Sequence, residues 1–185
     1  LDNPKGLVQI FHGMAEHSKR YENFANFLNE KGYIVYANDH RGHGNSIFPN
    51  KPLAYIGQDG FNKIVEDENI IYDYIRTKHK GLHLYIFDHS FGSFIGQEYI
   101  IKNSHKIDGI ILSGSAKQDG LDIKAASLLA AIQNKLIDNE KPAKLIDKLS
   151  FGSYNDGIQD QRTKFDWLSR DKEEVDKYIA DPLSG

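Results

Sequence analysis

The sequence predicts an α/β fold in which a mainly parallel sheet of about four strands is flanked by helices. Two observations predict this class: strand-like and helical segments alternate between residues 6 and 112, and each strand-like segment is nearly all apolar. Strands buried on both faces have this composition, which is typical of parallel sheets covered by helices. A chain of 185 residues suits one domain with a sizeable core.

The expected elements are read from the spacing of apolar residues and from stop signals. The first strand, "GLVQIF", is apolar and ends at His12-Gly13, and the helix after it stops at Gly32. Later strands end in polar, glycine-rich segments. The predicted strands are 6–11, 32–37, 82–87 and 107–112, and the predicted helices between them are 21–31, 61–79 and 90–103.

The alternation stops after Ser115. Helices are expected at 121–138, 141–149 and 172–179, and no strand pattern appears from 116 to 185. We therefore divide the chain into residues 1–116, a sheet with its helices, and residues 117–185, a helical cap or lid segment over the carboxyl edge of the sheet, incomplete at its end.

Composition excludes several functions. The net charge is −3 with both signs interspersed, so the basic stripe typical of nucleic-acid binding is absent. Without cysteine there is no disulfide and no catalytic thiol. No apolar run reaches membrane-spanning length and no signal peptide is visible. The cellular location stays open, with the cytoplasm favoured.

Four polar loops should meet at one edge of the sheet: "HGMAEHS", "DHRGHG", "DHSFG" and "SGSAKQ". Each follows a predicted strand, and ligands of open parallel sheets bind beyond the carboxyl ends of the strands. This edge is therefore the predicted functional site. A metal site at "DHRGHG" is the weaker interpretation, because no zinc spacing such as H-E-x-x-H occurs, and neither a metal nor a cofactor is predicted.

"DHSFG" resembles a nucleophile elbow, which places Ser90 at the turn from a strand to a helix. Ser90 is the candidate nucleophile. The Phe91 N–H, which follows it, and the Met14 N–H in the first loop are the candidate oxyanion donors. The alternative is an ordinary serine that caps a helix.

Three stretches carry a family resemblance: "HGMAEHSKRYENFANFLNEKGYIVYANDHRGHGNS", "HSFGS" and "WLSRDKEEVDKYIADPL". Together they resemble the monoacylglycerol lipase and lysophospholipase (serine aminopeptidase-like) group of the α/β-hydrolase superfamily, over Gly6 to Leu183. The resemblance implies a partial α/β-hydrolase fold with a lid-like cap, and hydrolysis of the ester of a lipid with one acyl chain.

The resemblance also implies roles for individual residues. Ser90 would be the nucleophile, with the amides of Met14 and Phe91 as the oxyanion hole. The polar head group would lie near Glu16, Arg20 and Tyr178, and the acyl chain near Leu128, Leu129 and Ile132, whose apolar stripe can equally be helix packing. A peripheral contact of the cap with a membrane is compatible with this arrangement.

The superfamily's triad runs Ser, then Asp or Glu, then His. The resemblance places the last two after further strands, and none follows here, so the chain looks truncated at both ends and inactive by itself. The strand at 107–112 would then be an exposed apolar edge, which favours association or segment swapping.

Asp88 stands where the elbow pattern has glycine. Three interpretations are open: a tolerated residue with its carboxylate in solvent or bonded to a turn amide, a damaged elbow, or a charge that weakens a nearby histidine base. The first is favoured.

Two other functions remain as alternatives to a lipid esterase. One is another hydrolase on the same scaffold, such as an aminopeptidase or small-ester esterase. The other is a non-catalytic hydrolase-like binding module.

Overall fold

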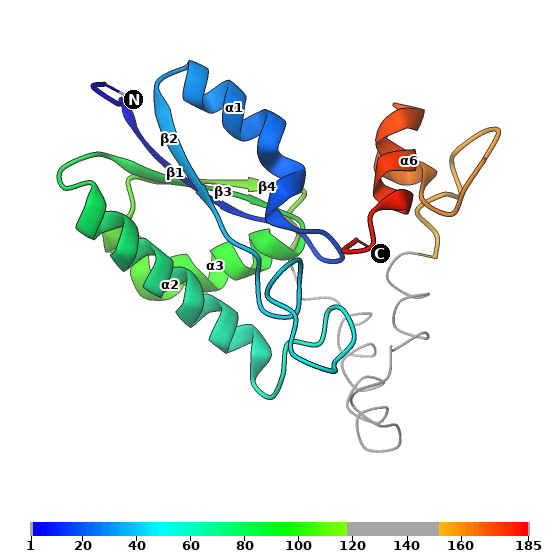
Figure 1. The fold of residues 1–185 in the computed structure, drawn as a ribbon, viewed down its shortest axis with the longest axis horizontal. Coiled ribbons are helices and arrows are strands. Elements are labelled where there is room, and N and C mark those ends of the chain that lie inside the picture. Colours follow the sequence, from blue (N-terminus) through cyan, green and yellow to red (C-terminus); the bar gives the residue numbers. More distant parts are fainter. Residues whose placement is uncertain (1, 118–151, 185) are drawn as a thin grey trace. The chain divides into compact units, whose positions relative to one another are not determined.

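A computed structural model of the chain describes residues 2–117 and 152–184. The chain divides into two compact units, Leu1–Ala116 and Lys117–Gly185. The first unit contains the sheet and the second ends in a helix (Figure 1). The predicted apolar stripe of Leu128, Leu129 and Ile132 lies outside the described residues.

The first unit is built on a four-stranded parallel sheet, which confirms the predicted fold class. The strands stand in the order β2-β1-β3-β4, so β1 is central and pairs with β2 on one side and β3 on the other. Their bounds are β1 Gly6–Phe11, β2 Tyr33–Ala37, β3 Leu84–His89 and β4 Gly109–Ser113.

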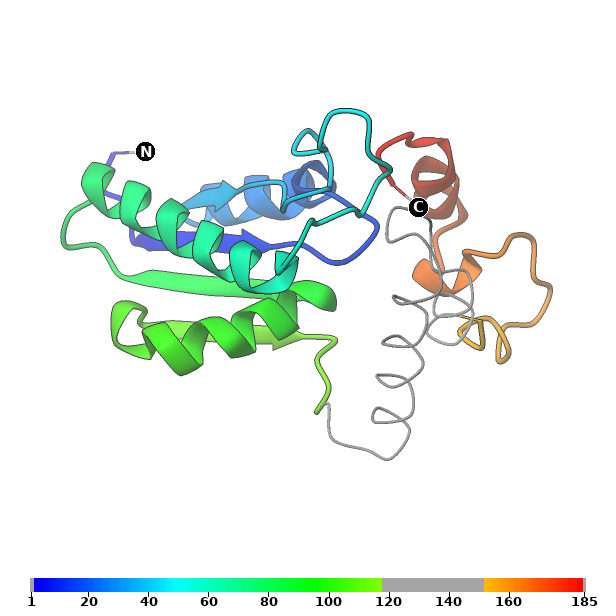
Figure 2. The same ribbon diagram turned by 90° about the horizontal axis from the view of Figure 1, so that it is seen from below.

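Helices cover both faces of this sheet. One face carries α1, Glu22–Glu30, and the other carries α2, Gly60–Lys78, and α3, Phe91–Asn103 (Figures 1 and 2). Short 3-10 turns at Ser18–Tyr21 and Ser104–Lys106 adjoin α1 and α3. The elements predicted between residues 6 and 112 all exist, and β3 extends beyond its predicted end to His89, which puts Ser90 directly after the strand. The helices predicted at 121–138 and 141–149 lie outside the described residues.

The main core lies between the sheet and the pair α2 and α3. Side chains alternate along β3, with Leu84 and Ile86 fully buried on this side. Phe87 faces the opposite side, where its ring lies 4.8 Å from that of Phe24 in α1. The buried core residues are Leu7, Phe11, Ile64, Val65, Tyr72, Ile75, Leu84, Ile86, Ile95 and Tyr99.

Burial on both faces holds for β1 alone, whose residues are all buried. The expectation that the other three strands are buried in this way is wrong, because β2 and β4 form the edges and one face of β3 is only partly covered. On β4, Ile111 is 60% and Leu112 40% exposed. The predicted apolar edge is therefore present in the described part of the chain.

The described part of the second unit contains a 3-10 turn, Asp166–Leu168, and α6, Lys172–Ala180, but no strand between residues 152 and 184. The Asp171 side chain caps α6 by accepting the Glu173 N–H at 2.9 Å. Tyr178 is buried on α6, and its ring meets that of Phe165 edge-on at 5.0 Å. No helix within residues 2–117 and 152–184 is long and apolar enough for a membrane span.

Candidate active site

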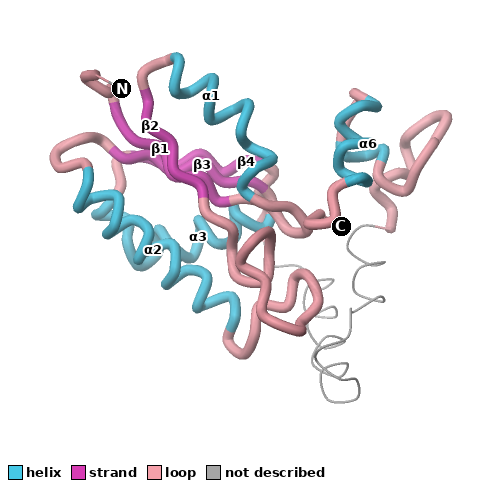
Figure 3. Tube along the Cα trace, viewed as in Figure 1, coloured by secondary structure: helices cyan, strands magenta, loops and turns pink. Residues whose placement is uncertain are grey.

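The loops after β1 and β2 lie at the same end of the sheet, as expected for parallel strands (Figure 3). The β3–α3 junction lies at this end too, and its strand is hydrogen-bonded to β1, with Phe11 opposite Asp88. Two of the four candidate loops, "HGMAEHS" and "DHSFG", thus come from neighbouring strands.

Ser90 adopts an unusual backbone conformation at the β3–α3 junction. Its φ is 52° and its ψ −115°, a region that costs a non-glycine residue free energy. The turn is held by backbone groups: the Ser90 N–H donates to the Ser113 carbonyl at 2.9 Å, and the Ser90 carbonyl accepts the Ser93 N–H at 2.8 Å. The Ser90 side chain makes no capping hydrogen bond, so the helix-cap alternative does not describe its hydroxyl.

The glycine after Phe91 lets α3 begin close to β1. A Cβ at Gly92 would collide with the carbonyl group of Phe11. Phe91 is the first residue of α3, where a backbone N–H has no intrahelical acceptor. Within residues 2–117 and 152–184, the elbow therefore holds the Ser90 hydroxyl, which makes no capping hydrogen bond, next to the Phe91 N–H, which has no intrahelical acceptor.

The first loop is organised around Glu16, which is 9% exposed. Its Oε1 accepts the Gly13 N–H at 2.6 Å and the Tyr21 hydroxyl at 2.7 Å. Burial, followed by the charge of Glu16, raises the pKa of Tyr21. Arg20 Nη1 lies 3.5 Å from Glu16 Oε2 and is the more exposed partner. The structure thus brings together the two candidate head-group residues of this loop.

Met14, between Gly13 and Glu16, is 44% exposed. Among the residues that the structure describes, neither the Met14 N–H nor the Phe91 N–H donates a hydrogen bond. Two unused donors at neighbouring strand ends are what an oxyanion hole requires.

Asp88 is fully buried, and within the described chain neither of its carboxyl oxygens has a hydrogen-bond partner. The expectation of a carboxylate in solvent or bonded to a turn amide is therefore wrong. Alternation along β3 turns Asp88 to the same side as Leu84 and Ile86, where its Oδ2 fills the space beside Gly96 of α3. Burial raises the pKa of Asp88 to about 7, although the polar backbone of Ser113 nearby, which makes no hydrogen bond of normal geometry with the carboxyl group, acts to lower it.

No imidazole is hydrogen-bonded to the Ser90 hydroxyl among residues 2–117 and 152–184. His89, its neighbour, has Nδ1 at 3.5 Å from the Ser113 hydroxyl. His12 is buried, and burial, together with the charge of His40, lowers the pKa of His12 to about 2. A general base for Ser90 is thus not found in the described residues.

The "DHRGHG" loop is a turn held by side-chain hydrogen bonds. Asp39 Oδ1 accepts the Ser18 N–H at 2.9 Å and hydroxyl at 2.6 Å, and Oδ2 accepts the Asn45 N–H at 2.7 Å. Arg41 does not bond to Asp39 but makes a bidentate pair with Asp67 of α2, at 2.5 and 2.7 Å. The described residues contain no cluster of three potential metal ligands.

Glu68 of α2 was not among the predicted site residues, yet it is fully buried beneath this loop. A signal was available: Glu68 lies four residues after Ile64 and four before Tyr72, on the apolar face of the helix. A carboxylate at such a position is unusual and requires partners.

The geometry of a parallel sheet, an elbow and an oxyanion-type loop defines the α/β-hydrolase class. The model of the family described as "Serine aminopeptidase, S33" matches residues 2–185. The chain belongs to this family, and within it is similar to the monoacylglycerol lipases.

Two curated relatives illustrate this similarity. A monoacylglycerol lipase of Mycolicibacterium smegmatis is 31% identical over 183 residues, which cover 98% of this chain and 57% of that protein. The human monoglyceride lipase is 28% identical over 180 residues, covering 97% and 52%. The chain thus spans little more than half the length of these relatives.

Among solved structures, a thermostable carboxyl esterase of Bacillus coagulans in complex with glycerol has a TM-score of 0.84 at 28% identity. The match covers 100% of this chain and 59% of the esterase. The sheet, its helices and the loops at its edge therefore have counterparts in an α/β-hydrolase of known structure.

Proposed function

We propose that the chain carries the nucleophile and the oxyanion hole of a serine hydrolase that acts on carboxylic esters of monoacyl lipids, monoacylglycerols or lysophospholipids. The Ser90 Oγ attacks the ester carbonyl carbon, its proton passes to a base, and the alcohol leaves. Water then hydrolyses the acyl-enzyme. The N–H groups of Met14 and Phe91 stabilise the negative oxygen formed in both steps.

The observation that carries this proposal is the strained backbone of Ser90 with its uncommitted hydroxyl. A conformation of this kind costs on the order of 1–3 kcal/mol and persists where the surrounding structure enforces it, commonly at functional sites. Here Gly92 and the bonds to Ser113 and Ser93 enforce it. A structural serine would gain nothing from this arrangement.

The names of the relatives, and the charged side chains of Glu16 and Arg20, support a lipid with a polar head group as the substrate. Arg20 stands beside Glu16 at the rim of the first loop, where it can donate to hydroxyl or phosphate oxygens. We assign the head group to this pair and to Tyr178, and the acyl chain to Leu128, Leu129 and Ile132 of the cap.

We propose further that the general base and its acid are not among residues 1–185. Residues 1–185 alone would then not turn over esters, whereas a protein that contains both groups would. Without a base, Ser90 remains a weak nucleophile at neutral pH.

A fluorophosphonate probe on the complete protein tests the nucleophile. We expect labelling of wild type and of Ser104→Ala, an exposed serine just after α3, and none of Ser90→Ala. Persistent labelling in Ser90→Ala, or none in a folded wild type, would refute the proposal, and the second result would favour a binding module. The 185-residue chain, assayed in parallel, should hydrolyse no ester.

A peptidase is the second candidate, because the matching family is described as serine aminopeptidase. A panel of monoacylglycerol, lysophospholipid, short-chain ester and aminoacyl substrates separates the two. We expect the highest kcat/KM for a monoacyl lipid, and a higher value for an aminoacyl substrate would replace the lipid assignment.

A further inference from the structure

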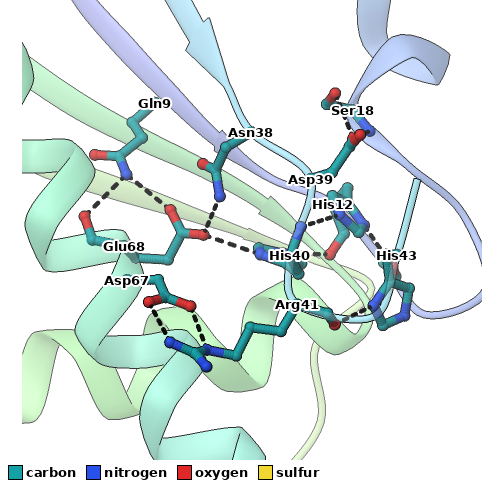
Figure 4. A network of polar contacts seen from close by, with 11 residues as sticks. Gln9, His12, Ser18, Asn38, Asp39, His40, Arg41, His43, Asp67 and Glu68 are labelled. Carbon is teal, nitrogen blue, oxygen red and sulfur yellow. Dashed lines mark hydrogen bonds and ion pairs between the residues drawn. The ribbon is translucent and has the colours of Figure 1, made fainter. Parts of the chain in front are cut away.

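A buried polar network connects α2 with the loop after β1 (Figure 4). Glu68 is at its base, with three side-chain donors on its two carboxylate oxygens. Gln9 Nε2 donates to Oε2 at 2.8 Å, and Asn38 Nδ2 donates to Oε1 at 2.8 Å. His40 Nδ1 lies 2.9 Å from the same Oε1. These three contacts provide hydrogen-bond partners for both oxygens of a fully buried carboxyl group.

His40 joins this carboxylate to the backbone of the first loop. Its Nδ1 faces Glu68, and its Nε2 lies 3.1 Å from the carbonyl oxygen of His12. A carboxylate and a carbonyl only accept hydrogen bonds, so both ring nitrogens of His40 carry hydrogen in this network. The His40 N–H also donates to His12 Nε2 at 2.9 Å. His40 therefore holds His12 at two points.

These contacts fix two consecutive peptide groups. In the His12–Gly13 peptide, the carbonyl accepts from His40 and the N–H donates to Glu16. In the Gly13–Met14 peptide, the carbonyl accepts from His12 Nδ1 at 2.7 Å. A trans peptide is planar, with its C=O and N–H pointing in opposite directions. Tying the Gly13 carbonyl to His12 therefore sets the direction of the Met14 N–H.

We propose that Glu68 is a positioning residue of the oxyanion hole: through His40 and His12, it holds the Gly13–Met14 peptide in the orientation that presents the Met14 N–H. The inference rests on the proposed function, in which Met14 is a donor. Glu68 is fully buried against Gln9 of β1 and reaches the first loop only through His40. When a neutral residue replaces Glu68, His40 loses the anionic partner of its Nδ1. The hydrogen bond from His40 Nε2 to the His12 carbonyl then weakens.

The test uses Glu68→Gln in the complete protein, with Glu66→Gln, an exposed glutamate of the same helix, as the matched control. Removal of one oxyanion donor costs about 10²–10³-fold in kcat, so misdirecting one should cost roughly tenfold to a hundredfold. We expect this loss in kcat per active site, counted by fluorophosphonate titration, with KM changed less than about twofold. Glu66→Gln should match wild type.

A second readout is independent of activity. Labelling with [¹⁵N]methionine gives an amide signal for Met14, assigned by its loss in Met14→Leu. We expect this signal to shift or broaden in Glu68→Gln and to stay in place in Glu66→Gln. If wild type never labels at Ser90, the proposed function fails, while the Met14 signal still reports whether Glu68 positions the peptide.

A purely structural role predicts other results. In that case Glu68→Gln lowers the thermal midpoint and the number of titratable sites, but kcat per site and the Met14 signal remain those of wild type, which would overturn the inference. If Glu68→Gln does not fold, Glu68→Asp replaces it in the test. This variant keeps the negative charge, but its shorter side chain places the carboxylate farther from His40, so a smaller loss of kcat and a smaller change of the Met14 signal are expected. Loss of folding in both variants would also assign Glu68 to stability alone.

Discussion

Burial of Asp88 should make the stability of this protein depend on pH in an unusual direction. The pKa of Asp88 is raised from 3.8 to about 7 by burial. Between about pH 4 and pH 7 the folded chain therefore retains a proton that the unfolded chain has lost. The free energy of unfolding falls as pH rises through this window and stays low above it. A carboxyl with a depressed pKa would act in the opposite direction.

The size of the effect follows from the shift. About three pKa units at about 1.4 kcal/mol each correspond to about 4 kcal/mol. Domains of this size are stable by about 5–15 kcal/mol, so the loss should be readily measured. Asp88→Asn keeps the shape of the side chain but cannot ionise. The difference in unfolding free energy between this variant and wild type should grow by several kcal/mol from pH 4 to pH 8.

Urea unfolding of both proteins, followed by circular dichroism at several pH values, measures this difference. Burying the asparagine amide adds a free-energy cost that does not vary with pH. The informative quantity is therefore the slope, against pH, of the difference in unfolding free energy between Asp88→Asn and wild type. Asp2→Asn, an exposed aspartate, controls for the change in net charge. A constant difference between Asp88→Asn and wild type from pH 4 to pH 8 would refute the reasoning. Comparing ester turnover in Asp88→Gly and wild type then shows whether Asp88 also affects the elbow.

Three further predictions concern the elbow, the second loop and the sheet edge. Gly92→Ala should lower the free energy of unfolding by about 2–4 kcal/mol in chemical denaturation, because the added methyl group meets the β1 backbone. The control Gly157→Ala, where a Cβ meets no other atom, should change it by less than about 0.5 kcal/mol. Arg41→Ala should cost about 1 kcal/mol at low salt and less in 1 M NaCl, because its pair with Asp67 is partly exposed; equal losses at both salt concentrations would contradict this. The 185-residue chain should self-associate in sedimentation velocity, and Ile111→Lys, on the exposed β4 edge, should reduce the association; a monomeric wild type would contradict it.

The fold class and the elbow could be predicted because their signals are local. Apolar runs of strand length that alternate with amphipathic helices determine a parallel sheet with few alternatives. The Ser90 turn is recognisable because a serine, a following glycine and a strand end lie within a few residues. Within the described residues, the predicted ends of the elements differ from the observed ones by only a few residues.

The direction of Asp88 and the role of Glu68 depend on contacts that no short stretch of sequence contains. Asp88 faces Gly96 because β3 continues to His89, beyond the end that its apolar run suggests. Glu68 meets Gln9 only through the packing of α2 on β1. Its position on the apolar face of α2 marks it as buried. Its partners come from β1 and from the loop after β2, and helical periodicity does not identify them.

The central position of β1 also has a kinetic consequence. The loop after β1 and the elbow after β3 become neighbours only when these two strands pair, and α1, β2 and α2 lie between them in the chain. Closing such a long segment is slow compared with forming a helix or a hairpin. During refolding, helical signal should therefore return before Ser90 and Met14 share a site, and reactivity at Ser90 should be among the last native properties to recover.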